Sequence, residues 1–254
     1  MKNLLSCNLG SYRRYRDTAY AHLQKIGVRH VEIPAPRPED AEAVNEVLAY
    51  FGLSAATLMV RGDLQNEGVA DEFLPGLQAA QKMGVSVVFT SLKAGDLPLD
   101  TAYARLRKIG DVAARHGVTV ALETHPDLCE NGAVALRTVQ AVNHPNVRIN
   151  FDTANVCYYN EGVDVLAELR KIAPFVAGVH LKDTNGGYKT WHFPTLGQGV
   201  VNYREVFAIM NGVGMRGPFT MELEGIQGQN LNLREQHASV EQSVAHLRSI
   251  GGVD

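Results

Sequence analysis

The stretch VAGVHLKDTNGGYKTWHFPTLGQG, residues 176–199, passes from an apolar segment into polar residues and then into a long loop with several glycines. Side chains of a β-strand alternate between two faces, so Val179 and Leu181 share one face while His180 and Lys182 share the other. One face is therefore apolar, and the other carries groups that can do chemistry. We expect such a strand to pack its apolar face on helices and to turn its polar face to an interior.

Three other segments repeat this alternation of apolar and polar side chains. They are VALETHP (120–126), INFDTAN (149–155) and FTMELEG (219–225). Their polar faces carry Glu123, Asp152 and Glu222, and the polar face of the first stretch carries His180. Each residue alone is compatible with a structural role. All four at equivalent depth on four strands favour one shared site, because three carboxylates and an imidazole are metal ligands.

Apolar strand-like runs alternate with longer amphipathic segments along the whole chain, a pattern typical of parallel βα units. We expect strands at residues 4–8, 30–33, 54–58, 85–90, 119–124, 147–152, 176–182 and 219–224. We expect helices at residues 14–26, 39–51, 71–83, 101–116, 133–142, 163–172, 203–210 and 233–250. Eight such pairs predict an α/β protein with a single (β/α)8 TIM barrel domain over residues 1–254. A doubly wound open sheet has the same local pattern, but it would concentrate its chemistry at one switch point.

Glycines support the expected helix boundaries. Gly27, Gly52, Gly84 and Gly117 each precede an expected strand. Glycine readily takes the left-handed conformation that ends a helix, so we expect all four at positive φ. No GxGxxG or Walker motif is present, and a nucleotide-phosphate site is therefore not indicated.

The composition is that of an ordinary globular protein. Of 254 residues, 45% are hydrophobic and 20% are charged, and the formal net charge of −3 does not favour a polyanionic partner such as nucleic acid. Cys7, Cys129 and Cys157 are widely spaced and form no CxxC pair, which argues against a disulfide framework. No apolar run approaches a membrane span, and no signal-peptide pattern is present. We therefore expect a soluble, cytoplasmic protein with neither a nucleic acid nor a membrane as partner.

The four expected ligands form a hard, anionic set. Such a set suits Mn²⁺, Mg²⁺ or Co²⁺ better than thiolate-preferring Zn²⁺, which stays compatible, and we expect one manganese ion. A divalent ion that chelates a ketone and its neighbouring hydroxyl acidifies the adjacent C–H bond and stabilises an enediolate. Glu123 and Glu222 would exchange protons as general base and acid. Epimerisation, isomerisation or loss of a β-hydroxyl group can all follow from this intermediate.

Further polar residues share inward faces with the expected ligands. His125 and Lys182 each lie two residues beyond a ligand, so both are placed to contact substrate oxygens. Glu32 faces inward by the same parity and is a weaker substrate-site candidate. Glu224 shares the face of Glu222 and would replace it as ligand if the strand register differed by one pleat. The remaining histidines on helices or near their ends are expected at the surface: His22, His30, His116, His144, His237 and His246.

These segments resemble the xylose-isomerase-like sugar isomerase and epimerase barrels, a family that includes ketose 3-epimerases, sugar-phosphate epimerases and inosose dehydratase. The resemblance covers essentially the whole chain and is carried by VALETH, NFDTAN, GVHLKD with a later GQG, and TMELEG. It implies a TIM barrel enzyme with a carbohydrate substrate. It also implies that one divalent ion is held by Glu123, Asp152, His180 and Glu222.

Two positions depart from the ketose epimerases. Those enzymes usually have a histidine three residues after the aspartate ligand, where this chain has Asn155, and an arginine six residues after the histidine ligand, where it has Gly186. Asn155 joins the substrate-site candidates. The HLKD form is more similar to the inosose dehydratase branch.

Three hypotheses about the reaction follow. The first is a metal-dependent isomerase or epimerase of a sugar, sugar phosphate or related keto-polyol. The second is an inosose-type dehydratase that uses the same metal site. The third is an AP-endonuclease-like nuclease, which would need more inward histidines and a basic surface than this chain offers.

The loop of residues 183–199 is long for a barrel connection. It mixes mobile glycines with the bulky side chains Tyr188, Trp191, His192 and Phe193. We expect a hinged cover that shields the reacting substrate from water, with Trp191 among the substrate contacts. The alternative is that the same aromatic residues anchor the interface of a homo-oligomer.

Overall fold

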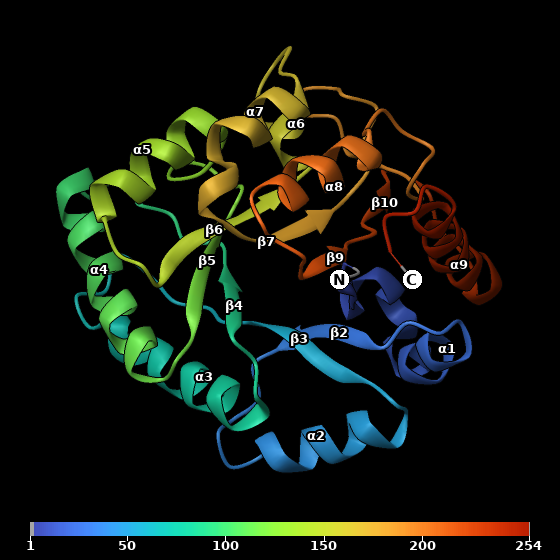
Figure 1. Cartoon of the computed structure of the whole chain (residues 1–254), viewed down its shortest axis with the longest axis horizontal. Helices are drawn as coiled ribbons and strands as arrows, with labels where there is room; N and C mark the ends of the chain where they lie inside the picture. Colours follow the sequence, from blue (N-terminus) through green and yellow to red (C-terminus); the bar gives the residue numbers. More distant parts are fainter. Residues whose placement is uncertain (1–2, 254) are drawn as a thin grey trace.

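The computed structural model describes residues 3–253, in which eight parallel strands close into a barrel (Figure 1). The strands in barrel order are β1 (Leu5–Asn8), β2 (His30–Pro34), β3 (Ser54–Met59), β4 (Val87–Thr90), β5 (Thr119–Glu123), β6 (Val147–Asp152), β7 (Val176–Leu181) and β9 (Phe219–Met221). The last strand pairs with the first, with Leu5 opposite Phe219. The (β/α)8 barrel predicted from the alternation is thus confirmed.

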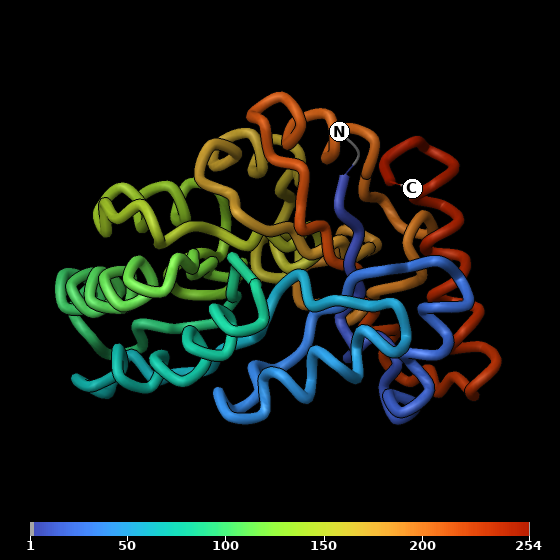
Figure 2. Tube along the Cα trace, turned by 60° about the horizontal axis from the view of Figure 1, so that its bottom comes forward, coloured from blue at the N-terminus to red at the C-terminus, as the bar shows by residue number. Residues whose placement is uncertain are grey.

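Helices surround the barrel, as Figure 1 shows, because each strand returns to the next through a helix on the outside. They are α1 (Ala19–Lys25), α2 (Ala41–Tyr50), α3 (Val69–Met83), α4 (Leu99–Arg115), α5 (Gly132–Val142), α6 (Asn155–Tyr159), α7 (Val165–Ile172), α8 (Tyr203–Gly212) and α9 (Leu233–Ser249). A 3₁₀ turn, η2 (Ala173–Phe175), leads into β7. Figure 2 shows the chain proceeding around the ring in sequence order, so that its last helix lies beside its first segments.

The expected first helix, residues 14–26, is wrong in its first half. The structure has a 3₁₀ segment, η1 (Leu9–Thr18), before α1 begins. Arg13 interrupts this segment with φ 55° and ψ −123°, and the Asn8 side chain accepts a hydrogen bond from the Gly10 amide at its start. Arg13 precedes the expected helix, but Tyr15 lies inside it with φ −104° and ψ 25°, so the regular helix begins only at α1. No sequence period reveals either backbone conformation.

Three short elements were not expected from the sequence. Helix α6 follows the aspartate at the end of β6, and a two-stranded antiparallel ribbon joins β8 (His192–Phe193) to β10 (Gly225–Ile226). Strands of two residues carry too little periodicity to be predicted. The ribbon matters for the site because it connects the long loop after β7 to the segment after β9.

The predicted boundaries between helices and strands agree with the backbone. Gly27, Gly52, Gly84 and Gly117 all have positive φ, between 65° and 74°, as expected for helix-ending glycines. The expectation of a surface position is wrong for His22, which is buried. Its Nδ1 is 2.7 Å from the Tyr12 hydroxyl and its Nε2 is 3.0 Å from Glu241. Helix α9 packing over η1 buries this histidine, and that contact is invisible in the local sequence.

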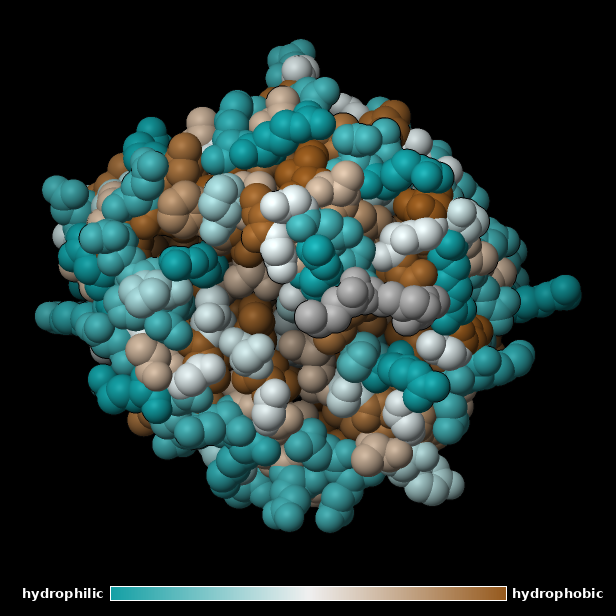
Figure 3. Space-filling model, viewed as in Figure 1, coloured by the Kyte–Doolittle hydropathy of each residue, from teal (hydrophilic) through white to brown (hydrophobic). Residues whose placement is uncertain are grey.

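The hydrophobic core fills the barrel wall and the space between strands and helices. On the face drawn in Figure 3, hydrophilic residues dominate the rim while hydrophobic residues gather nearer the centre. The three cysteines are buried and unpaired. Over the described part of the chain, no helix combines the length and the apolar character needed to cross a membrane.

Candidate metal centre

The structure brings the four expected ligands together at the carboxyl ends of four strands. Glu123 and Asp152 end β5 and β6, His180 is the fifth residue of β7, and Glu222 directly follows β9. One ligand atom from each lies within 4.8 Å of those of the other three. His180 Nδ1 is 2.9 Å from Glu123 Oε1, 3.5 Å from Glu222 Oε2 and 4.0 Å from Asp152 Oδ2. This cluster of three carboxylates around one imidazole nitrogen can bind a metal ion.

Glu32 supports the cluster from the other side of the imidazole. Its Oε1 is 3.0 Å from His180 Nε2. Thr57 donates a 2.6 Å hydrogen bond to Oε2, and Asn8 donates a 2.7 Å hydrogen bond to Oε1. Glu32 is buried and both its oxygens are engaged, so it fixes the ring of His180 with Nδ1 toward the carboxylates. Glu32 faces inward, as the parity predicted, and also lines the cavity above the cluster.

The turn after β6 orients the carboxylate of Asp152. Its Oδ1 accepts 2.8 Å hydrogen bonds from the backbone N–H groups of Ala154 and Asn155, which leaves Oδ2 directed into the cluster. Burial raises the pKa of Asp152 to about 6; the Lys182 charge opposes this increase, and the Glu222 and Glu123 charges add to it. Negative charge is therefore crowded around Asp152.

Lys182 is buried beside the cluster and faces three carboxylates. Its Nζ lies 3.3 Å from Asp152, 2.9 Å from Glu222 and 2.6 Å from Glu224. Asn155 Oδ1 is 3.2 Å from the same ammonium group. Burial lowers the pKa of Lys182, but the carboxylate charges outweigh burial and hold it well above its ordinary value. Lys182 is consequently an ammonium ion.

The same contacts distinguish the two glutamates that follow β9, Glu222 and Glu224. Glu222 Oε2 lies 3.5 Å from His180 Nδ1 and belongs to the ligand cluster. Glu224 is more exposed and contacts Lys182 from outside the cluster. The register therefore places Glu222 among the ligand candidates, and Glu224 beside the ammonium group of Lys182.

Glu123 has a second set of partners. His125 Nε2 is 3.1 Å from Glu123 Oε2, and the Ser91 hydroxyl donates to the same oxygen. The Tyr159 hydroxyl lies 2.8 Å from the other ring nitrogen of His125. Although burial raises the pKa of Glu123, hydrogen bonds from His125 and His180 hold it well below its usual range. Glu123 is therefore an ionised carboxylate at the cavity wall.

The charge of this site fits a divalent cation. Five carboxylates contact His180 or Lys182, namely Glu32, Glu123, Asp152, Glu222 and Glu224. Against five negative charges, Lys182 supplies one positive charge, and His180 adds one more only when it is protonated. Burying uncompensated carboxylates is costly, so an ion of charge +2 among three of them would offset the excess.

A cavity of about 540 Å³ opens above the cluster. Its lining includes Glu123, His125, Lys182 and Glu222, together with Trp191. Sequence reasoning missed further lining residues that follow strands or lie on α6: Ser91, Tyr158 and Tyr159. Ser91 comes directly after β4. The expectation that site residues lie at the carboxyl ends of the strands, which identified Glu123, could therefore also have identified Ser91. The tyrosines have no comparable signal, because their helix was not expected.

The loop after β7 is held in place at its base. Asp183 Oδ2 accepts hydrogen bonds from the N–H groups of Gly197 and Gly199, at 2.8 and 2.9 Å. A Cβ at Gly199 would collide with this carboxylate, which explains why the GQG sequence pairs with the aspartate of HLKD. Near the loop tip, Trp191 packs edge-on against Phe193 and Tyr158 and remains 38% exposed. The loop thus has a fixed base and an aromatic tip over the cavity.

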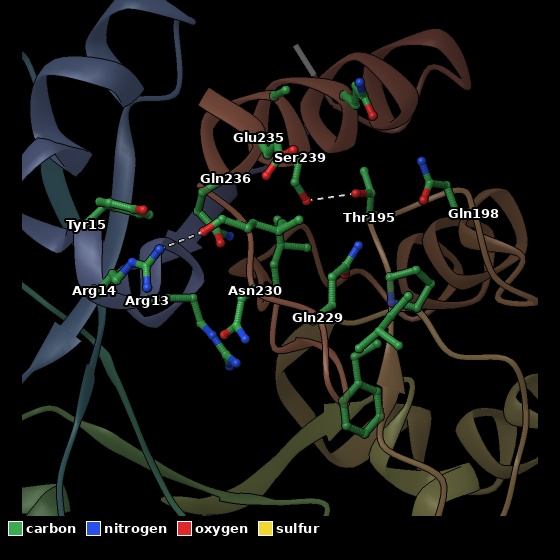
Figure 4. A pocket seen from close by; sticks show the side chains of 18 residues that line it. Arg13, Arg14, Tyr15, Thr195, Gln198, Gln229, Asn230, Glu235, Gln236 and Ser239 are labelled. Carbon is green, nitrogen blue, oxygen red and sulfur yellow. Dashed lines mark hydrogen bonds between the residues drawn. The ribbon is translucent and has the colours of Figure 1, made fainter. Parts of the chain in front are cut away.

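A second cavity, of about 530 Å³, lies beside the first, between α9, η1 and the loop before α8 (Figure 4). The Thr195 hydroxyl is 2.7 Å from that of Ser239 at its upper side, as Figure 4 shows. None of the four ligand candidates lines this cavity, and its polar groups are mainly amides and hydroxyls. The candidate chemistry therefore belongs to the first cavity.

Comparison with known proteins agrees with this geometry. The family described as Xylose isomerase-like TIM barrel matches residues 20–250. An inosose dehydratase from Klebsiella pneumoniae subsp. pneumoniae is 24% identical over 256 residues, covering 85% of this chain and 84% of that protein. A 3-dehydroshikimate dehydratase from Bacillus anthracis is 29% identical over 119 residues, covering 40% of this chain and 41% of that protein. The solved D-psicose 3-epimerase from Clostridium cellulolyticum H10 superimposes with a TM-score of 0.79 at 14% identity, over 98% of this chain and 99% of that chain.

Proposed function

The chain belongs to the xylose isomerase-like TIM barrel family, and from this we propose that it is a Mn²⁺-dependent dehydratase of a keto-polyol. The observation that carries the proposal is the ammonium group of Lys182, 2.9 Å from Glu222 in the wall of the cavity. Departure of a hydroxyl group needs a proton. The Lys182 ammonium group can deliver one once a divalent ion at Asp152 and Glu222 offsets the carboxylate charge that raises its pKa. The inosose dehydratase aligned over most of this chain adds support.

Different residues of the cavity remove and deliver protons in the proposed reaction. A divalent ion held by Glu123, Asp152, His180 and Glu222 would polarise the substrate carbonyl and acidify its α-hydrogen. Glu123 then removes the α-proton, and Lys182 protonates the β-hydroxyl as its C–O bond breaks, so that water leaves and a C=C bond forms. The aromatic residues Phe193 and Trp191 limit access of bulk water to this space.

An isomerase or epimerase is the second candidate, and one observation favours it. Glu123 and Glu222 both line the cavity and belong to one cluster, as expected for a pair of carboxylates that exchange protons. The Lys182 ammonium weakens this assignment, because it pairs with Glu222 and stabilises the form that has no proton to give. We therefore propose dehydration as the reaction, in preference to the isomerisation or epimerisation that was the first hypothesis from the sequence.

The reaction itself separates the two candidates. We expect the Mn²⁺-loaded protein to convert at least one member of a panel of inososes, ketoses and their phosphates. In D₂O, followed by NMR, a dehydratase loses water and forms an unsaturated product. An epimerase exchanges the α-proton and keeps its hydroxyl groups. Deuterium exchange with inversion and no loss of water would overturn the dehydratase proposal.

Metal content provides a direct test of the ligand cluster. We expect about one divalent ion per chain after purification with Mn²⁺, since the four residues make one complete set. Chelator treatment should remove the ion, abolish turnover and lower the thermal unfolding midpoint, because the buried carboxylates then lose their counter-charge. Inductively coupled plasma mass spectrometry and melting curves measure both effects. Two or three zinc ions per chain would contradict this assignment.

A further inference from the structure

We propose that the cavity has an anion subsite formed by Arg13, Arg16 and Arg61, and that the substrate carries a phosphate or carboxylate group. This inference rests on the proposed function, since it assigns the far end of the same substrate. All three arginines line the cavity that Glu123 and Lys182 also line. A guanidinium group binds phosphate or carboxylate with charge-assisted, often bidentate hydrogen bonds.

The three arginines lack partners within residues 3–253. No hydrogen bond or ion pair engages their guanidinium groups, and all three are exposed. The carboxylates that line the same cavity are already engaged elsewhere: Glu32 and Glu123 with His180, and Glu222 and Glu224 with Lys182. Three guanidinium groups without protein partners on one cavity are therefore available to bind an anion directly.

Barrel topology places these arginines after strands that carry none of the four ligand candidates. Arg13 and Arg16 follow β1, and Arg61 follows β3. In the closed order of eight strands, β3 lies four positions from β7, which carries His180. β1 lies four positions from β5, which carries Glu123, and pairs on its other side with β9, which Glu222 follows. A keto-polyol bound at the cluster would therefore direct its other end toward the arginines. In this arrangement the subsite binds the terminal group of the substrate, and the metal cluster binds the carbons that react.

Arg13 and Arg14 provide a matched comparison within one segment. Arg13 holds the strained backbone at φ 55° and lines the reaction cavity. Arg14 turns aside, and its guanidinium donates a 3.4 Å hydrogen bond to the Leu231 carbonyl (Figure 4). Both arginines line the second cavity, but only Arg13 also lines the first. Strain of this kind persists where the surroundings hold it and recurs at ligand clamps, which agrees with a binding role for Arg13.

Calorimetry with matched sugars tests the subsite without requiring turnover. The probes for the Mn²⁺-saturated protein are D-fructose, D-fructose 6-phosphate and 5-keto-D-gluconate, which distinguish a neutral sugar, a phosphate and a carboxylate. We expect at least one anionic probe to bind about tenfold more tightly than D-fructose. The preference should shrink as salt rises, because exposed charges are screened. Whichever anionic probe binds more tightly identifies the group.

Variants assign the effect to residues. Arg13→Gln, Arg16→Gln and Arg61→Gln should each weaken binding of the preferred anion by about tenfold and leave D-fructose unchanged. Arg14→Gln should change neither, and melting curves verify that every variant is folded. Three results would overturn the subsite. They are equal affinity for charged and neutral probes, no binding of either anion at about 10 mM, and an anion affinity that is unchanged in all three variants.

The outcome is separable from that of the proposed function. If the protein dehydrates a neutral inosose at a rate that the arginine variants do not change, the subsite proposal is rejected and the dehydratase proposal is retained. If the protein binds an anion preferentially, loses this preference in the variants and epimerises its substrate in D₂O, the subsite proposal is retained and the dehydratase proposal is rejected.

Discussion

Glu123→Gln should lower turnover by about 10³-fold while the protein stays folded. The substitution keeps the shape of the side chain and an oxygen acceptor for His125 and Ser91, but it removes the ability to take a proton. Initial rates of substrate loss measure the first effect, and the thermal unfolding midpoint measures the second. A change of a few degrees in the midpoint is compatible with the prediction.

Asp152→Asn separates proton transfer from metal binding. Asp152 belongs to the ligand cluster but does not line the cavity that Glu123 lines, so we expect it to bind the metal and not to take a proton from the substrate. This variant should lose activity at low Mn²⁺ and recover much of it at high Mn²⁺. Glu123→Gln should stay inactive at every Mn²⁺ concentration. Full recovery of Glu123→Gln with excess metal would reduce Glu123 to a ligand.

The two glutamates that follow β9, Glu222 and Glu224, extend this comparison. Glu222→Gln should cost much more activity than Glu224→Gln, because only Glu222 lies within the ligand cluster. Glu161→Gln, an exposed position, serves as the surface control and should leave the rate unchanged. If Glu224→Gln is the inactive variant, the assignment of Glu222 to the metal site is wrong.

Lys182→Met should stop loss of water, with turnover lowered by about 10² to 10⁴-fold. Methionine has a similar length and no proton to give. Since Glu123 is intact in this variant, exchange of the α-proton with D₂O should continue in the absence of product. NMR in D₂O measures both quantities in one sample, and retained exchange without dehydration is the expected result.

The substitution also removes the positive charge from among three carboxylates, so folding must be checked separately. Asp152, Glu222 and Glu224 would lose their shared ammonium partner, and we expect a lower unfolding midpoint in the absence of Mn²⁺. Lys182→Gln, which keeps hydrogen-bond donors, provides a second variant if Lys182→Met does not fold. Lys189→Met, at an exposed position of the loop that follows Lys182, is the control. Normal dehydration by folded Lys182→Met would exclude Lys182 as the acid.

Local periodicity was sufficient to predict the barrel and the inward direction of the ligand candidates. In a strand, alternate residues share a face, so Glu123, Asp152, His180 and Glu222 were predicted to face one interior without knowledge of strand pairing. Their convergence required only that the strands be parallel and adjacent, because the carboxyl ends of such strands meet at one rim.

Only the tertiary structure decided which groups contact each other across the barrel. Glu32 on β2 holds His180 on β7, and Arg13 faces the same cavity from a backbone conformation that no period predicts. The ribbon that pins the long loop joins residues 192–193 to residues 225–226. Closure of the barrel sets these contacts between distant segments, whereas sequence periodicity reports only which way each side chain points from its own strand.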